Sequence, residues 1–293
     1  MIDAHHHLWD LNAVNYPWLM EKRKRRFFGD PTPIQRNYLI DEHIKLANEL
    51  GFKGSVHIQV GAADGLEEAQ WINSVVNENQ SWPMVQVAFC DLSSDQRELH
   101  LDKLQKLSSV VGVRQIIGRS PAEDANSKTN ELLTSDNFMQ GLQSISDRGL
   151  TFDLQIIPEL FKTCATVFSQ FPNLQVILCH AGSPYNRTLG GIKSWAGDLI
   201  HLSNLSNVSC KLSGLGMFDH NWTGSTVAPI VTTVMDQFGS KRVMFGSNFP
   251  VDSLSSSFEQ LFTRLSSNVD DKDFEDVFSK TAQRIYFSNF SAF

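Results

Sequence analysis

Short apolar segments rich in β-branched residues alternate along the chain with polar, helix-like stretches, and this alternation constrains the fold most strongly. The apolar segments cover residues 2–8, 54–60, 84–92, 110–117, 150–157, 174–180, 208–212 and 243–246. Such continuous hydrophobicity is typical of parallel strands that are covered on both faces. Helices are expected between them, for example over residues 63–79, 94–107 and 158–170. Eight such units in 293 residues predict one α/β domain over residues 1–293, a single (β/α)8 barrel.

Two stretches interrupt the alternation. Residues 11–37 contain the basic run Lys22-Arg23-Lys24-Arg25-Arg26, which we interpret as a solvated loop rather than a targeting or nucleic-acid motif. Because this loop follows the first strand, one of its arginines is also a candidate for binding an anionic substrate. Residues 184–198 are rich in Gly, Asn and Ser, and this composition predicts a mobile loop or lid.

Composition excludes several classes of protein. The formal net charge of −7 argues against a general nucleic-acid binder. No apolar run is long enough to span a membrane, and the N-terminus shows no signal-peptide pattern, so we expect a cytoplasmic protein. The four cysteines are widely spaced, which predicts buried free thiols rather than a zinc ribbon or a disulfide framework.

Polar side chains at the ends of the apolar segments are the candidates for chemistry, because barrel active sites form at the carboxyl ends of the strands. They are His5, His7, His57, Arg114, Asp153, Gln155, His180, Lys211 and Asn248. Alternation along a strand places His5 and His7 on one face, toward the barrel mouth, and turns His6 away. The pair suits one zinc-like ion or two hydrogen bonds to a substrate carbonyl, and a packing role is the alternative.

His180 ends its segment and is followed by Gly182 and Pro184, so it is expected at the barrel rim beside the histidine pair. Arg114 and Lys211 are cations within apolar segments. They require either an ion pair, for which Asp153 is a candidate partner, or an anionic or carbonyl-bearing ligand. His57 lies early in its segment and is expected deeper in the barrel.

Five motifs in order resemble the amidohydrolase-related family that includes sugar lactonases and the pyrone-dicarboxylate lactonase. They are Asp3-Ala4-His5-His6-His7-Leu8-Trp9-Asp10, Gly112-Val113-Arg114, Leu178-Cys179-His180-Ala181-Gly182-Ser183-Pro184, Cys210-Lys211-Leu212-Ser213-Gly214 and Met244-Phe245-Gly246-Ser247-Asn248-Phe249-Pro250. The resemblance implies a distorted (β/α)8 barrel that hydrolyses a lactone. It implies either no cofactor or one zinc-like divalent ion held by His5, His7 and His180. It also makes a homodimer an assembly to test.

One position departs from the family pattern. The usual aspartate that activates water after the eighth strand is replaced by Asn248, and a neutral amide cannot act as a general base. Asn248 can still bind substrate or orient water. The base must then be His5, His7, His180, or a carboxylate such as Asp153 or Asp252, which could curl back over the mouth.

The sequence therefore predicts a hydrolase that opens a small lactone by attack of activated water. His5, His7, His180 and Asp252 are the catalytic candidates, and Arg114, Lys211, Asn248, Gln155 and His57 are the candidates for substrate binding. Two alternatives stay open. One is a metal-dependent non-oxidative decarboxylase, and the other is a catalytically impaired barrel that only binds its ligand.

Overall fold

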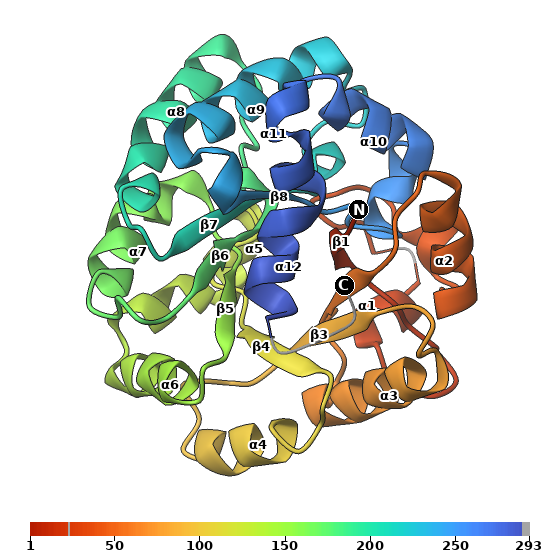
Figure 1. Cartoon of the computed structure of the whole chain (residues 1–293). Coiled ribbons are helices and arrows are strands. Elements are labelled where there is room, and N and C mark those ends of the chain that lie inside the picture. Colours follow the sequence, from red (N-terminus) through yellow and green to blue (C-terminus); the bar gives the residue numbers. More distant parts are fainter. Residues whose placement is uncertain (23, 289–293) are drawn as a thin grey trace.

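The computed structural model describes residues 1–22 and 24–288 and contains one eight-stranded parallel sheet in the order β1 to β8. Each strand lies inside one of the apolar segments. The strands are β1 Asp3–His6, β2 Ser55–Ile58, β3 Met84–Ala88, β4 Val110–Arg114, β5 Thr151–Leu154, β6 Val176–Leu178, β7 Val208–Leu212 and β8 Val243–Phe245. The predicted α/β barrel is confirmed, and Figure 1 shows its helices arranged around the strands.

Most helices lie around the outside of the sheet, whereas α12 lies over one end of the barrel (Figure 1). The helices are α1 Pro17–Met20, α2 Ile40–Glu49, α3 Gly65–Glu78, α4 Arg97–Leu104, α5 Pro121–Ser127, α6 Asp136–Asp147, α7 Phe161–Phe168, α8 Leu189–Ser203, α9 Gly224–Phe238, α10 Phe258–Ser266, α11 Asp271–Glu275 and α12 Thr281–Tyr286. The helices expected at residues 63–79, 94–107 and 158–170 correspond to α3, α4 and α7. No helix in the described part of the chain is long and apolar enough to span a bilayer.

The prediction of a loop over residues 184–198 is wrong from Leu189 onward, because α8 begins there. Thr188 caps the helix by accepting a hydrogen bond from the Gly191 N–H at 3.1 Å. Trp195, Leu199 and Leu202 then form a buried face at helical spacing. This packing outweighs the low helix propensity of the two glycines in the first turn.

The barrel closes through backbone contacts beyond β8 rather than through a ladder between the described residues of β1 and β8. The Asn248 N–H donates to the His5 carbonyl at 2.6 Å, and the His7 N–H donates to the Phe249 carbonyl at 2.7 Å. The pairing of β1 with β2 also shifts register between Asp3 and His6. The structure therefore matches the distorted barrel that the resemblance implies.

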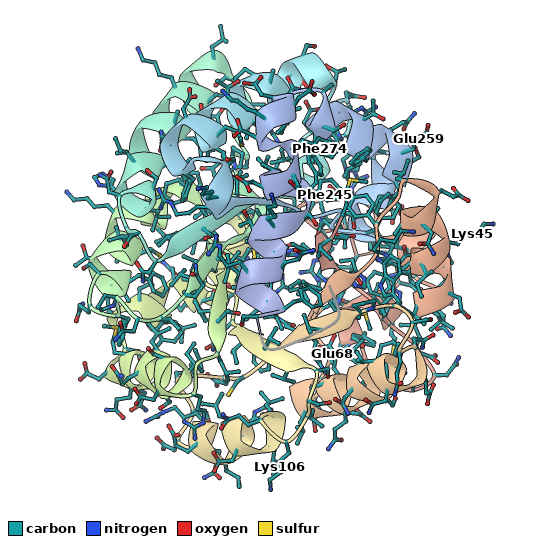
Figure 2. All side chains as sticks on the ribbon, viewed as in Figure 1. Lys45, Glu68, Lys106, Phe245, Glu259 and Phe274 are labelled. Atoms are coloured by element: carbon teal, nitrogen blue, oxygen red, sulfur yellow. The ribbon has the colours of Figure 1, made fainter. Side chains whose placement is uncertain are left out.

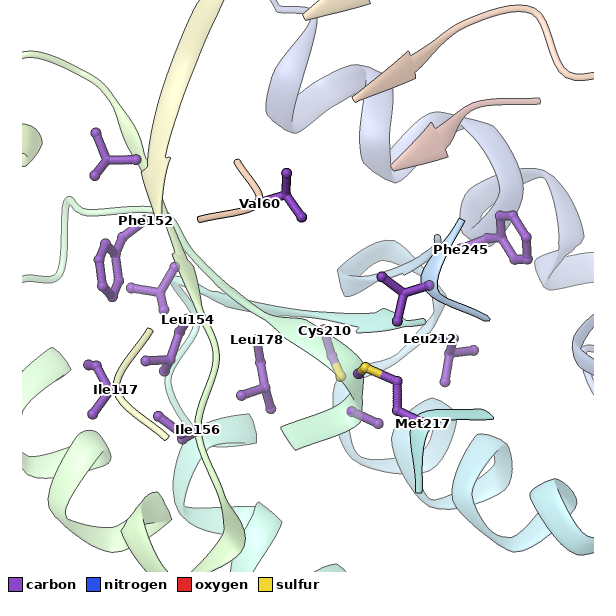
Figure 3. Packing of buried hydrophobic residues seen from close by; sticks show 14 of the residues in the cluster. Val60, Ile117, Phe152, Leu154, Ile156, Leu178, Cys210, Leu212, Met217 and Phe245 are labelled. Atoms are coloured by element: carbon purple, nitrogen blue, oxygen red, sulfur yellow. The ribbon is translucent and has the colours of Figure 1, made fainter. Parts of the chain in front are cut away.

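Two apolar layers hold the barrel together. Inside it, residues such as Val56, Ile58 and Val87 pack with Tyr286 of α12. Outside it, residues including Phe152, Leu178 and Phe245 pack between strands and helices (Figure 3). Charged side chains such as Lys45, Lys106 and Glu259 are exposed at the periphery, whereas Glu68 is buried further in (Figure 2). Because both faces of the strands are covered by apolar layers, the polar side chains at the strand ends remain to form a site.

Candidate active site

A cavity of about 460 Å³ opens at the carboxyl ends of the strands. Five predicted site residues line it, each directly at or after the end of a different strand. These residues are His7, Arg114, Gln155, His180 and Asn248. His5, His57, Lys211 and Asp252 are not among its lining residues. The structure therefore brings together about half of the predicted set.

His5 lies between His7 and His180. Its ring centroid is 5.1 Å from that of His7 and 4.6 Å from that of His180. Gly246 permits this close approach, because a Cβ there would lie 2.5 Å from the Cβ of His5. Neither ring nitrogen of His5 has a hydrogen-bond partner among the described residues, although both are buried. Such a side chain is poised to bind a ligand, water or metal ion.

His180 is presented on a strained turn. Its φ is 56°, in the left-handed region that residues other than glycine seldom occupy, and Ala181 and Ser183 follow at 51° and 57°. The Nδ1 atom of His180 lies 3.0 Å from the Ser213 hydroxyl, which fixes the ring while Nε2 remains available. A Cβ at Gly214 would lie 2.3 Å from this Nδ1, so the turn requires glycine there.

His7, Asn248 and Asp252 form a buried chain of hydrogen bonds. The Nδ1–H of His7 donates to the Ile58 carbonyl at 2.7 Å, because a carbonyl can only accept. Nε2 of His7 lies 3.2 Å from Oδ1 of Asn248, and Nδ2 of Asn248 donates to Asp252 at 3.0 Å. With the amide placed in this way, Nε2 needs a proton and His7 is charged. A neutral His7, which its burial favours, requires the amide to be turned over, so that it donates to Nε2 and accepts from a protonated Asp252.

Asp252 does not curl over the mouth as expected from the sequence. It is 1% exposed and reaches the cavity only through Asn248. A further role that the sequence did not reveal belongs to Asp3, which accepts from the backbone N–H and the hydroxyl of Ser247 at 2.8 and 2.6 Å. Asp3 thereby fixes the segment that carries Asn248.

His57 points away from the barrel interior, contrary to the depth expected for it. Its Nδ1 accepts from the Leu8 N–H at 3.1 Å, and its Nε2 lies 3.7 Å from Glu68 on α3. His6 also faces outward, as predicted, and stacks on His43 of α2 at 3.8 Å. These outward rings hold helices against the sheet.

Lys211 adopts the first of its two predicted alternatives. Its ammonium donates to Asp153 at 2.6 Å, and both side chains are fully buried. Tyr286 donates to the other carboxylate oxygen at 2.7 Å and places its ring 4.9 Å from the ammonium. Arg114 has no such carboxylate among the described residues and lines the cavity instead. Lys211 and Arg114, which have similar sequence contexts, therefore have different roles.

Burial holds the site histidines in their neutral form. It lowers the pKa of His5, His7 and His180 well below the usual value, assisted by the cation Arg114 at all three and by Lys211 at His5 and His180. Burial also raises the pKa of Asp3 to about 6, and those of Glu68 and Asp252 to about 7. Neutral imidazoles can accept a proton or bind a metal ion.

These pKa shifts predict that the protein loses stability as the pH falls below 6.5. The pKa is lowered for six buried histidines, so the unfolded chain takes up protons there that the folded chain refuses. The three raised carboxyls act oppositely, because their stabilisation is lost as the pH rises through 6 to 7. Because the histidines outnumber the carboxyls, the free energy of unfolding should fall by at least about 1.4 kcal/mol for each pH unit below 6.5. This is the slope for one net proton taken up on unfolding. Denaturant titrations between pH 7.5 and 5 measure this, and a flat profile would contradict it.

Two groups of side chains come into question for a metal ion. Ligand atoms of His5, Asp153 and Cys179 lie within 4.8 Å of one another. This group does not fit, because Lys211 and Tyr286 occupy both oxygens of Asp153, and burial raises the pKa of the Cys179 thiol to about 12. His5, His7 and His180 are the other group. Both nitrogens of His5 have no partner among the described residues and Nε2 of His180 is available, but His7 would have to give up its contact with Asn248 to bind an ion.

Part of the cavity wall comes from the segment after β1, where the sequence predicted an arginine but not the aromatic residues. Residues 11–37 contribute Trp18, Phe27 and Phe28 together with Arg26. Arg26 pairs with Glu123 at 3.2 Å, which ties this loop to α5, while Lys22, Lys24 and Arg25 are exposed. Arg23 lies outside the described residues. The position of the loop after β1 was the signal that pointed to the catalytic face.

A model of the amidohydrolase family matches residues 2–287. Two curated relatives each align with 89% of the chain. An uncharacterized Sinorhizobium fredii protein, y4mH, is 32% identical over 266 residues and 89% of its own length. An L-fucono-1,5-lactonase of Burkholderia multivorans is 23% identical over 275 residues and 85% of its length.

Among solved structures, a zinc-bound amidohydrolase from Burkholderia multivorans superposes with a TM-score of 0.82 at 21% sequence identity. The match covers 98% of both chains. At this identity the likeness concerns the fold alone.

Proposed function

The chain belongs to the amidohydrolase family, and on that premise we propose that it is a hydrolase that opens the ring of a small lactone. One observation carries the proposal. Two neutral histidines, His7 and His180, share a cavity with the cation Arg114 at the carboxyl ends of the strands. A neutral imidazole can take a proton from water, and a guanidinium can stabilise the oxyanion that forms on the carbonyl. The lactonase name of a relative at 23% identity agrees with this chemistry.

The proposed reaction uses His180 as the general base. Nε2 of His180 accepts a proton from water while the water oxygen bonds to the lactone carbonyl carbon. Arg114 stabilises the resulting oxyanion. The bond from this carbon to the ring oxygen then breaks, and His180 returns the proton to the leaving oxygen, which gives a hydroxy acid. A divalent ion held by His5, His7 and His180 would polarise the carbonyl and acidify water. Nε2 of His180 would then be a metal ligand, so its role as the base applies to the site without an ion.

Asn248 and Asp252 are positioning residues in this proposal. Together they hold Nε2 of His7 in place, and Asp252 acts on the cavity only through the amide. This arrangement explains how asparagine can occupy the strand-8 position without being a base.

Asn248→Asp should therefore lower kcat rather than raise it. The new carboxyl would face the buried carboxyl of Asp252 at the present 3.0 Å contact, and two such groups cannot both ionise. We expect a loss of about 10–100-fold, as for other residues that orient a catalytic ligand. Steady-state kinetics measure the effect. The exchange Asn248→Asp with Asp252→Asn restores an amide–carboxyl contact and should recover most of the loss, whereas a gain in the single variant would contradict the proposal.

Ring opening is tested by base uptake at constant pH with a panel of sugar-acid and aromatic-ring lactones. The protein is assayed after chelation and after loading with zinc. Hydrolysis of at least one lactone is expected. Release of CO2 from aromatic acids with no lactone opened would favour the decarboxylase. Ligand binding without turnover in either preparation would favour an impaired barrel.

A further inference from the structure

The ends of β1 and β2 are joined by an exchange of side chains. The two strands pair up to His6 and His57. If this parallel ladder continued, the Leu8 N–H would donate to the Ile58 carbonyl. The His7 ring takes that acceptor instead, because its Nδ1 lies 2.7 Å from the Ile58 carbonyl oxygen. The Leu8 N–H donates to Nδ1 of His57 at 3.1 Å. Each strand therefore offers a histidine ring in place of one backbone group of the ladder.

The Leu8 N–H depends on His57 for its hydrogen bond. On the side of β8, the Phe249 carbonyl already accepts from the His7 N–H at 2.7 Å. Leu8 is fully buried, and a buried N–H without an acceptor is as costly as a lost hydrogen bond. Without the His57 ring, the Leu8 N–H would therefore compete with the His7 ring for the Ile58 carbonyl.

The surroundings of His57 keep its ring in the form that can accept. Burial and the cation Arg114 lower its pKa to about 3, so the ring is neutral and only one nitrogen carries a proton. That nitrogen is Nε2, since Nδ1 accepts from Leu8. Nε2 lies 3.7 Å from Oε1 of Glu68, too far for a hydrogen bond but close enough for the oxygen to attract the N–H. Glu68 is 2% exposed on α3, and the same oxygen accepts from the Val60 N–H at 2.9 Å.

We infer that His57 is a positioning residue for His7. By accepting from the Leu8 N–H, it leaves the Ile58 carbonyl to the His7 ring and keeps the proton of neutral His7 on Nδ1. Nε2 of His7, the nitrogen that faces Asn248 in the cavity, then carries the lone pair. This inference rests on the proposed function, which places His7 among the reacting groups, whereas the orientation of the ring can be measured without a substrate.

Nitrogen NMR of the unmodified protein, labelled with ¹⁵N and kept at neutral pH, tests the hydrogen bonds directly. We expect the ring proton on Nε2 in His57 and on Nδ1 in His7. We also expect a scalar coupling through the hydrogen bond between the Leu8 amide nitrogen and Nδ1 of His57. A proton on Nδ1 of His57, or a His7 ring that is protonated on Nε2 alone, would overturn the inference.

Two substitutions of His57 separate positioning from packing. His57→Phe keeps a ring but removes the acceptor, and we expect kcat to fall by about 10–100-fold with little change in KM, as for other residues that orient a catalytic ligand. His57→Asn can accept from the Leu8 N–H through its amide oxygen and should recover most of the loss. The matched control is Ile72→Ala, since Ile72 is fully buried on the same helix as Glu68 and does not line the cavity. It should lower the melting temperature and leave kcat unchanged.

Spectra and kinetics together separate this inference from the proposed function. If no lactone is opened, but His57→Phe moves the His7 proton off Nδ1 and His57→Asn restores it, the lactonase proposal fails and the positioning of His7 stands. If lactones are opened and His57→Phe leaves kcat and the His7 proton unchanged, the inference is overturned. Equal losses in His57→Phe and His57→Asn, or the same loss of kcat in Ile72→Ala, would mean that His57 only packs and would also overturn it. Should His57→Phe fail to fold, the spectra of the unmodified protein still test the inference.

Discussion

Replacing His180 by asparagine is expected to lower kcat by about 10²–10⁴-fold, the range for removal of a general base. Asparagine is the suitable substitute because it tolerates the left-handed backbone at this position and can still bond to the Ser213 hydroxyl. The cavity should therefore persist while Nε2, the proton acceptor, is lost. Steady-state kinetics on the best lactone of the panel measure the effect.

The matched control for this variant is His201→Asn. His201 is exposed near the end of α8, so its loss should leave kcat unchanged. A His180→Asn enzyme with near wild-type kcat would place the base elsewhere, whereas a variant with a lowered melting temperature would point to a loss of folding. Thermal unfolding of both variants distinguishes these outcomes.

Lys211→Met is expected to cost about 3–5 kcal/mol of unfolding free energy, the usual cost of breaking a buried ion pair. The change leaves the buried carboxylate of Asp153 with Tyr286 as its remaining strong donor. Combining it with Asp153→Leu removes the uncompensated charge and should recover part of the loss. Denaturant unfolding of the single and double variants measures both effects.

Lys280 and Glu275 provide a matched comparison for the buried pair. Their ion pair has the same 2.6 Å separation, but both side chains are more than half exposed. Lys280→Met should therefore cost less than about 1 kcal/mol. Equal costs for the two lysines would mean that burial does not determine the contribution of the Lys211 pair.

The strands were predictable because burial on both faces leaves a continuous apolar signature, and each observed strand lies inside a predicted segment. Helix α8 was not predictable, because Gly190, Gly191 and Ser194 give its sequence the composition of a loop. Its stability comes from contacts of Trp195 and Leu199 that depend on the assembled barrel. Local composition does not report such contacts.

The site was predictable only in part, for a related reason. Arg114 and Lys211 look alike in the sequence, but only Lys211 pairs with Asp153, which lies on β5, two strands away in the sheet. His7 lines the cavity and His5 does not, although strand alternation predicted one face for both. These differences arise from packing between elements that are distant in sequence.

Hydrolysis in water enriched in ¹⁸O tests the central claim most directly. Attack of activated water on the carbonyl carbon predicts that each molecule of hydroxy acid carries one ¹⁸O atom, in its new carboxylate, and that His180→Asn slows the formation of this labelled product by the same factor as it lowers kcat. Mass spectrometry of the product gives the result. Label in the alcohol oxygen, or no labelled product from chelated or zinc-loaded protein, would contradict the account.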